Sequence, residues 1–174
     1  KTPDGLVFDP FDDEQISLVI ELVKDIVARH AIKPERVLGH SDIAPNRKND
    51  PGPKFPWKRF ADAGLILWPD TALVTQKRVM YDAKLPDVKW FQEKLKAHGF
   101  EVPQHGDLDR ATKDVISAFQ MKYRPARYDG QPDAETAALV DALVTPNDEK
   151  VRSTLERVGQ SPLPTFNVRI GWLL

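Results

Sequence analysis

Residues 37–57 read "VLGHSDIAPNRKNDPGPKFPW" and combine a histidine, two aspartates and several prolines in one short stretch. The apolar residues at its start favour a short buried strand that ends at Gly39. His40 follows directly, and side chains at strand ends are often functional in α/β folds. The loop from there to Asp50 is too rich in proline to be a helix, and its prolines stiffen the backbone by fixing φ.

The residues before and after this stretch predict helices. Apolar side chains recur at intervals of three and four over residues 11–32, and Asp12 with Gln15 forms a capping-box-like start. Residues 56–64 predict a second, short helix that ends at a glycine. A helix that leads into a strand indicates an α/β domain over residues 1–69.

The rest of the chain changes in character. Residues 70–86 show no sustained periodicity and are interpreted as a linker, whereas residues 87–144 predict a small all-α domain of three helices. The loops "GDLDRAT" and "GQPDAET" both read Gly, two residues, Asp, two residues, Thr, which indicates an internal repeat with capped helices. Residues 145–174 form a tail with a short predicted helix and strand, and no function is assigned to it.

Composition limits the classes of function. The chain has 174 residues and a net charge of −1, which argues against a nucleic-acid-binding protein that neutralises phosphates. Cysteine is absent, so a metal would have to use histidine or carboxylate ligands. No apolar run is long enough to cross a bilayer, so membrane anchoring would need a segment before Lys1. Because the chain begins with lysine, we expect a processed protein or a fragment.

An imidazole and a carboxylate without a thiolate suit catalytic zinc, which takes three protein ligands and leaves one position for water. His40 and Asp50 are the candidate ligands, and Lys48 could stabilise a developing oxyanion beside them. The alternative is structural: a hydrogen-bonded histidine, a turn-forming aspartate and a solvated lysine. The remaining histidines lie near helix ends or turns and are interpreted as structural: His30, His98 and His105.

Through the quoted stretch, residues 11–69 resemble the zinc-dependent N-acetylmuramoyl-L-alanine amidases of the AmpD/AmiD type, and most of all the AmiD branch. This family is related to animal peptidoglycan-recognition proteins. The resemblance implies a mixed sheet with helices, of which residues 1–69 would be the C-terminal part. It also implies that His40 and Asp50 ligate zinc and that Lys48 assists catalysis.

Residues 87–144 separately resemble three-helix peptidoglycan-binding domains, through "GDLDRATKDVISAFQ" and "DGQPDAET". Together the resemblances imply an enzyme of the periplasm or cell envelope that degrades the cell wall, with peptidoglycan or a muropeptide as substrate. The bond cleaved would be the amide between the lactyl group of N-acetylmuramic acid and L-alanine. Anchoring to the outer membrane is left open.

The sequence departs from the amidase pattern in one respect. The family has a further zinc-ligand histidine and a catalytic glutamate on strands that precede this segment, and neither has a counterpart here. We therefore expect the N-terminal half of the same amidase as a partner of this chain. The alternative is a non-catalytic peptidoglycan-recognition fragment whose helical domain does the binding.

Overall fold

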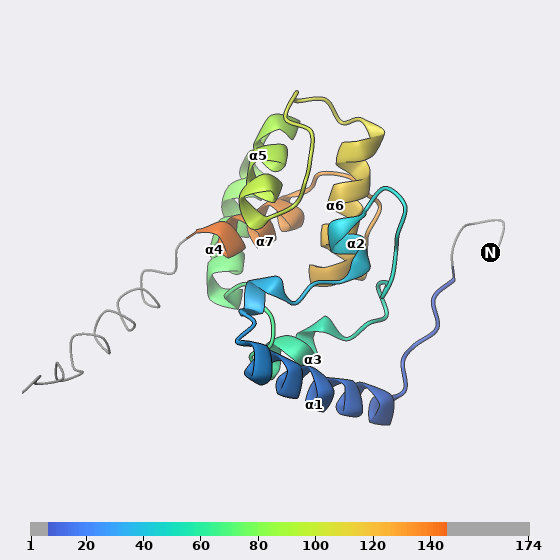
Figure 1. The fold of residues 1–174 in the computed structure, drawn as a ribbon. Helices are drawn as coiled ribbons and strands as arrows, with labels where there is room; N and C mark the ends of the chain where they lie inside the picture. Colours follow the sequence, from blue (N-terminus) through green and yellow to red (C-terminus); the bar gives the residue numbers. More distant parts are fainter. Residues whose placement is uncertain (1–6, 146–174) are drawn as a thin grey trace, which may run out of the picture. The chain divides into compact units, whose positions relative to one another are not determined.

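The computed structural model describes residues 7–145, and all of the regular structure in that range is helical (Figure 1). The elements in chain order are α1 Asp13–His30, η1 Pro34–Arg36, α2 His40–Ile43, α3 Trp57–Asp62, α4 Thr71–Ala83, α5 Val88–His98, α6 Arg110–Tyr123 and α7 Ala134–Val144. The mixed sheet expected for residues 1–69 is therefore not seen in the described part of the chain. None of the helices in this range is long and apolar enough to cross a bilayer.

The predicted strand ending at Gly39 is wrong. The backbone is extended at Val37 and Gly39, but no other extended segment within residues 7–145 pairs with it. Leu38 is 49% exposed, so the segment is not buried either. The Gly39 N–H donates to the side chain of Asp42 at 2.8 Å, and the chain turns into α2 at His40. The prolines do not prevent this helical turn because they come after it.

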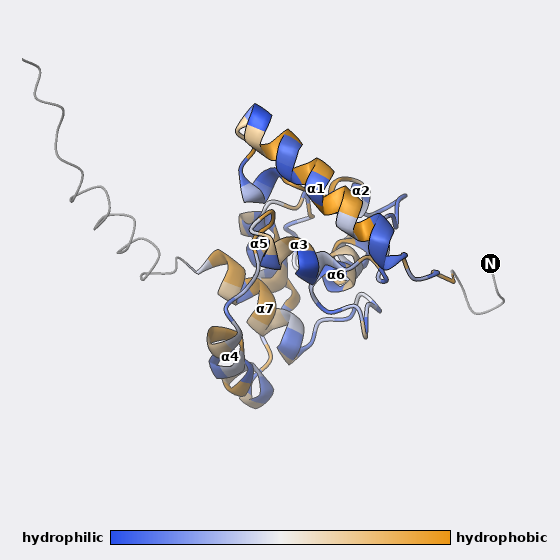
Figure 2. Cartoon of the chain, turned by 90° about the horizontal axis from the view of Figure 1, so that it is seen from below, coloured by the Kyte–Doolittle hydropathy of each residue, from blue (hydrophilic) through white to orange (hydrophobic). Residues whose placement is uncertain are grey.

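The first hydrophobic cluster forms between α1 and α3. The Asp12 carboxylate caps α1 by accepting the N–H groups of Glu14 at 2.9 Å and Gln15 at 3.2 Å, as the capping pattern predicted. Figure 2 shows α1 with distinct hydrophobic and hydrophilic sides. The buried members of the cluster are Ile16, Ile20, Trp57, Phe60, Leu65 and Ile66. The predicted helices at residues 11–32 and 56–64 are both present with slightly shorter bounds.

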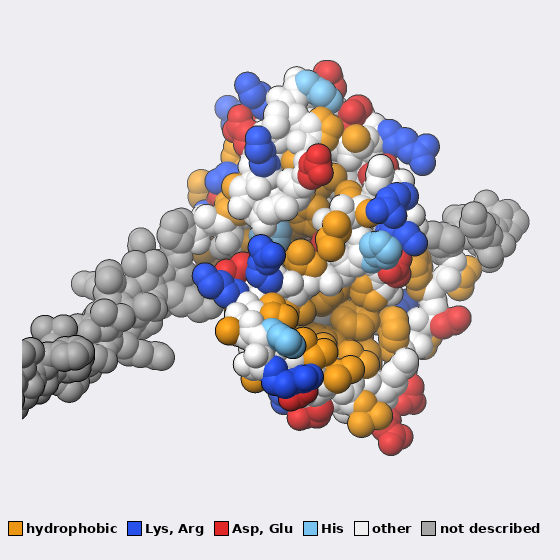
Figure 3. Space-filling model, viewed as in Figure 1, with side chains coloured by type: hydrophobic (Ala, Val, Ile, Leu, Met, Phe, Trp, Pro, Cys, Tyr) orange, Lys and Arg blue, Asp and Glu red, His pale blue; other side chains and the backbone are white. Residues whose placement is uncertain are grey.

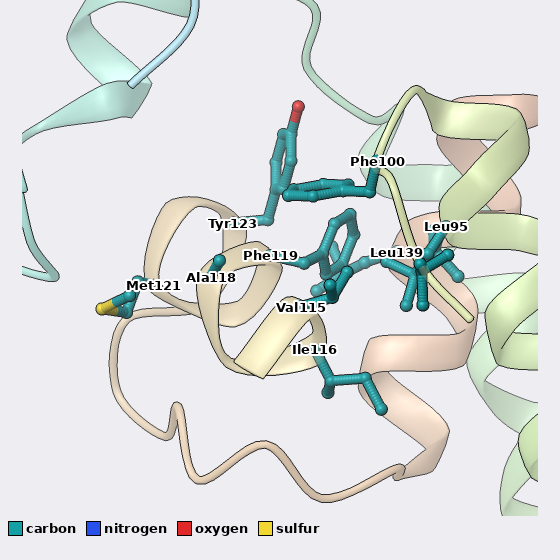
Figure 4. Close-up of a cluster of buried hydrophobic side chains, with 11 residues drawn as sticks. Leu95, Phe100, Val115, Ile116, Ala118, Phe119, Met121, Tyr123 and Leu139 are labelled. Atoms are coloured by element: carbon teal, nitrogen blue, oxygen red, sulfur yellow. The ribbon is translucent and has the colours of Figure 1, made fainter. Parts of the chain in front are cut away.

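The three predicted helices of the second half are confirmed as α5, α6 and α7. Each begins after an aspartate whose carboxylate accepts a backbone N–H two or three residues into the helix. The pairs are Asp87 with Trp90, Asp109 with Thr112, and Asp133 with Thr136. Phe119 lies in the middle of the resulting core, among Phe100, Val115 and Leu139 (Figure 4).

The internal repeat has a physical basis that its two loop motifs did not reveal. A fully buried glutamine closes each loop: it accepts the N–H of the loop glycine and donates to the hydroxyl of the threonine. Gln92 does so with Gly106 at 2.8 Å and Thr112 at 2.9 Å, and Gln120 with Gly130 and Thr136, both at 3.0 Å. The two loops are therefore held by the same set of contacts.

Residues 70–86, expected to be a linker, contain α4 instead. Asp70 caps this helix by accepting the Leu73 N–H at 2.8 Å. The helix packs against α7, where Lys77 at 2.5 Å and Tyr81 at 2.7 Å both donate to the Asp141 carboxylate. No residue of α4 is buried, so much of its attachment is polar and hydrophobic periodicity could not detect it.

Trp68 joins the two hydrophobic clusters. Its side chain packs against both of them, and its ring lies 5.3 Å from that of Tyr123 in α6. The described residues up to Val144 accordingly form one compact unit. The tail expected over residues 145–174, with its predicted helix and strand, lies outside the described residues except for Thr145.

Candidate metal-binding site

Backbone hydrogen bonds close the loop that carries the candidate ligands. The Ser41 N–H donates to the carbonyl of Asp50 at 2.9 Å, which ties the two ends of the loop together. Inside it, the Ala44 N–H donates to the His40 carbonyl at 3.0 Å, and the Lys48 N–H donates to the Ala44 carbonyl at 2.9 Å. The local fold alone therefore brings positions 40 and 50 side by side.

Close packing reinforces this closure at Gly39. A Cβ added at this glycine would lie 2.9 Å from Cδ of Pro51 and 3.0 Å from Cζ2 of Trp57. Contacts this short would force the neighbouring atoms to move. The residue before His40 thus lies directly against the residue after Asp50, and only glycine fits there.

The two candidate ligands meet at their side chains. His40 Nδ1 lies 3.1 Å from Asp50 Oδ2, and both side chains face solvent, with 44% and 63% of their surface exposed. Tetrahedral zinc with bonds of about 2.1 Å would separate two ligand atoms by about 3.4 Å. The spacing and the donor types therefore fit two ligands of one zinc ion, and they equally permit a direct hydrogen bond.

Lys48 lies on the same loop, two residues before Asp50, and its side chain is half-buried. Within the described part of the chain its ammonium forms no ion pair. A lysine in this state keeps its charge available to an oxygen that acquires negative charge nearby.

A surface hollow of about 770 Å³ adjoins the loop. Its lining includes Phe8, Pro53, Phe55 and Tyr128, with Lys54 as a charged member. The hollow thus offers both apolar and polar surface to a small molecule.

Sequence reasoning missed a buried ion pair behind the loop. Lys122 of α6 donates to Oδ2 of Asp42 at 2.7 Å, and both side chains are 6% exposed. Its ammonium also lies 4.4 Å from the ring centroid of Trp57. The one available signal was a lysine between the buried residues Met121 and Tyr123, and it does not name a partner 80 positions away.

The other histidines lie away from the His40–Asp50 pair. Burial, and then the charge of Lys122, lowers the pKa of His98 to about 4, and its Nε2 lies 3.2 Å from the hydroxyl of Tyr123. His105 Nε2 lies 3.3 Å from Asp109, and His30 is exposed in the last turn of α1. The histidines visible in Figure 3 are accordingly separate from one another. Over residues 7–145, no group of three or more potential ligands is arranged around a metal position.

The loop and the helical domain each match a known family. Residues 4–53 match the N-acetylmuramoyl-L-alanine amidase family, and residues 84–140 match the peptidoglycan binding domain family. The first match contains His40, Lys48 and Asp50. The chain therefore combines a segment of the N-acetylmuramoyl-L-alanine amidase family with a peptidoglycan-binding domain.

Particular relatives share both parts. The N-acetylmuramoyl-L-alanine amidase AmiD of Escherichia coli K12 is 44% identical over 138 residues, which cover 79% of this chain and 50% of AmiD. The crystal structure of AmpDh3 from Pseudomonas aeruginosa aligns with a TM-score of 0.77 at 37% identity, over 87% of this chain and 59% of AmpDh3.

AmiD from E. coli has also been solved with the substrate anhydro-N-acetylmuramic acid-L-Ala-D-gamma-Glu-L-Lys. That structure aligns with a TM-score of 0.73 at 39% identity, over 92% of this chain and 59% of AmiD. The chain spans about half the length of AmiD.

Proposed function

We propose that this chain is part of a zinc-dependent N-acetylmuramoyl-L-alanine amidase. The reaction is hydrolysis of the amide between the lactyl group of N-acetylmuramic acid and the L-alanine of the stem peptide. The observation that carries the proposal is the 3.1 Å approach of His40 Nδ1 and Asp50 Oδ2, which lies within the segment matching the amidase family.

In this proposal His40 and Asp50 hold the zinc ion. A zinc ion bound there would supply Lewis-acid polarisation of the amide carbonyl and a lower pKa for the attacking water. The loop keeps the two side chains together through the Ser41–Asp50 backbone hydrogen bond, so the ligands need little rearrangement on binding.

Lys48 acts on the substrate rather than on the ion. Its ammonium stabilises the negative charge that develops on the carbonyl oxygen as water adds to the amide. The muropeptide lies in the hollow beside the loop, where aromatic side chains such as Phe55 and Tyr128 offer apolar surface.

The third zinc ligand and the general base come from another segment of the amidase. Catalytic zinc normally has three protein ligands, and His40 and Asp50 supply two of them. The corresponding relatives are about twice as long as the part this chain matches. We assign the missing histidine and glutamate to the N-terminal half of the same amidase.

The helical domain supplies affinity for the polymer, and the protein works in the periplasm or cell envelope, where peptidoglycan lies. The match of residues 84–140 to the peptidoglycan binding domain family supports this role. If the partner half contributes no ligand and no base, the chain is instead a non-catalytic peptidoglycan-recognition protein. The domain match favours that second function independently of His40.

The experiment uses the whole protein, with zinc content and muropeptide cleavage measured on the same preparations. Asp50→Ala removes one of the two proposed zinc ligands of this chain, so zinc content and cleavage should both fall to background. Asp107→Ala is the matched control, because it removes another exposed aspartate whose carboxylate lies near a histidine, His105. Full zinc occupancy with normal cleavage in Asp50→Ala would refute the ligand assignment. Zinc binding without any cleavage by the wild type would favour the recognition protein.

A further inference from the structure

We propose that Lys122, a residue of the peptidoglycan-binding domain, is a positioning residue for the metal-binding loop. It acts through Asp42 and holds the backbone that presents His40. The inference rests on the proposed function for its catalytic meaning, whereas its structural core is testable without metal or substrate.

The contact chain from α6 to the loop is short. Lys122 Nζ donates to Asp42 Oδ2 at 2.7 Å, and the same oxygen accepts the Gly39 N–H at 2.8 Å. Gly39 is bonded directly to His40. One carboxylate oxygen therefore connects the ammonium on α6 to the residue that precedes the candidate ligand.

Burial makes this connection hard to replace. Both side chains are 6% exposed, and Asp42 Oδ1 has no hydrogen-bond partner among the residues that the structure describes. Removal of Lys122 would leave a buried carboxylate with the Gly39 N–H as its remaining partner. Breaking a buried pair on one side is strongly destabilising, because the other charge cannot reach water without a change in the backbone.

The lysine is also fixed on its own side. Its neighbours Met121 and Tyr123 are buried in the core of the helical domain, and its ammonium lies over the ring of Trp57, 4.4 Å from the centroid. Trp57 in turn packs against Gly39. The ammonium therefore has an ionic contact with Asp42 and an aromatic contact with Trp57, the residue that packs behind Gly39.

It follows that the peptidoglycan-binding domain has a second role, which its family match does not describe. Besides holding the polymer, it supports the geometry of the amidase loop. An amidase segment separated from this domain would keep His40 and Asp50 in sequence but would lose the charge that orders Gly39.

The first test measures amide hydrogen exchange in the metal-free whole protein. In Lys122→Met, exchange at the Gly39 and Ser41 amides should rise about tenfold or more above any rise in α5 and α7. Lys77→Met is the matched control, since it removes another lysine that pairs with a buried aspartate, Asp141. It should leave the two loop amides at the wild-type rate.

A second variant separates the charge effect from lost packing. Asp42→Asn together with Lys122→Met removes both charges while leaving an amide oxygen for the Gly39 N–H. Loop exchange should return most of the way to the wild-type rate. The inference is overturned if the loop amides in Lys122→Met exchange as in the wild type, or if they rise only in step with α5 and α7.

Zinc affinity then tests the link to the metal site. Lys122→Met should weaken zinc binding about tenfold to a hundredfold, the usual effect of losing support behind a ligand, and Lys77→Met should not. If the wild type binds no zinc, the proposed metal site fails while the exchange result still decides the role of Lys122. If zinc binds equally well to wild type and Lys122→Met, the proposed function stands and the positioning role fails.

Discussion

His40 and Asp50 lie side by side because packing and backbone hydrogen bonds of a few neighbouring residues close the loop between them. Gly39 has no room for a Cβ between Pro51 and Trp57, and Ser41 bonds to the carbonyl of Asp50. The side chains are free to face solvent because the closure is made by backbone and packing behind them. The geometry of the His40–Asp50 pair therefore depends on these neighbouring residues as much as on the two side chains themselves.

Replacement of Lys48 should affect the rate of catalysis but not the binding of zinc. If the whole protein is the zinc amidase proposed above, Lys48→Ala should keep the zinc and lose about a hundredfold or more in kcat, since an oxyanion partner acts mainly in the transition state. Lys58→Ala is the control, because Lys58 is an exposed lysine on α3 that pairs with Asp62 and does not line the neighbouring hollow. Steady-state kinetics with a muropeptide, together with metal analysis, make the measurement. A loss of zinc in Lys48→Ala would show that the lysine supports the ligands instead.

His98 should make stability depend on pH. Its folded pKa is lowered to about 4, first by burial and then by Lys122, with Asp42 opposing the shift. The imidazole of the unfolded chain binds a proton below its ordinary pKa of about 6.5, whereas the buried one stays neutral. The stabilisation is therefore complete above pH 6.5 and is lost as pH falls to 4, by about 3 kcal/mol in total.

Urea unfolding of wild type and His98→Gln between pH 7.5 and pH 4 checks this expectation. The glutamine can keep a hydrogen bond to the hydroxyl of Tyr123 but does not titrate. The difference in unfolding free energy between the two proteins should shrink or reverse as the pH falls. Parallel profiles would mean that His98 is protonated as easily in the folded state as in the unfolded one.

At the scale of elements, the two repeated loops of the helical domain make the same hydrogen bonds but differ in how closely their glycines are packed. Gly130 has a φ of +71°, and a Cβ there would lie 2.6 Å from the carbonyl oxygen of Lys113. Gly106 also has a positive φ, but the nearest atom to an added Cβ is 3.7 Å away. The second loop is therefore packed against backbone, whereas the first is open.

Alanine at these two positions should differ accordingly. Gly106→Ala should cost about 1 kcal/mol for the left-handed backbone alone. Gly130→Ala should cost about 3 kcal/mol, since the carbonyl of Lys113 must also move. Thermal or urea unfolding of the two variants gives the comparison. Equal losses would indicate that the second loop relaxes without disturbing α6.

The sequence predicted the helices whose stabilising interactions are local, and it missed the one held by residues distant in the sequence. α1, α3, α5, α6 and α7 were predicted because their caps and apolar faces are local, as with Asp12 at α1 and Asp109 at α6. α4 was missed because polar contacts with Asp141, about sixty positions away, hold much of it. The strand at Gly39 was predicted from apolar character alone, which cannot tell whether a neighbouring strand exists.

The same distinction applies to the candidate site. His40, Lys48 and Asp50 stand within one loop, so a sequence motif could indicate them together. Their roles as ligands and oxyanion partner stay predictions. Asp42 and Lys122 could not be paired from sequence, because the partner of a buried charge is set by how α2 and α6 pack.

At the scale of the whole molecule, the helical domain should need α4. A fragment of residues 70–144 should unfold at a clearly higher urea concentration than one of residues 87–144, because α4 packs on α7 and gives Asp141 two of its partners. Both fragments should sediment with insoluble peptidoglycan if they are folded. Circular dichroism and sedimentation check the two statements separately. Equal stability of the fragments would mean that α4 does behave as a linker.

Trp68 packs into both hydrophobic clusters. This contact limits the exchange of either domain for another by recombination. A domain on a free tether can be exchanged between genes by recombination without repair at the junction. Here a domain that replaced the helical one would have to pack against the indole of Trp68, as the ring of Tyr123 does. It would also have to supply a cation for Asp42. Where the two domains occur together, substitutions at these contacts should therefore appear in lineages together.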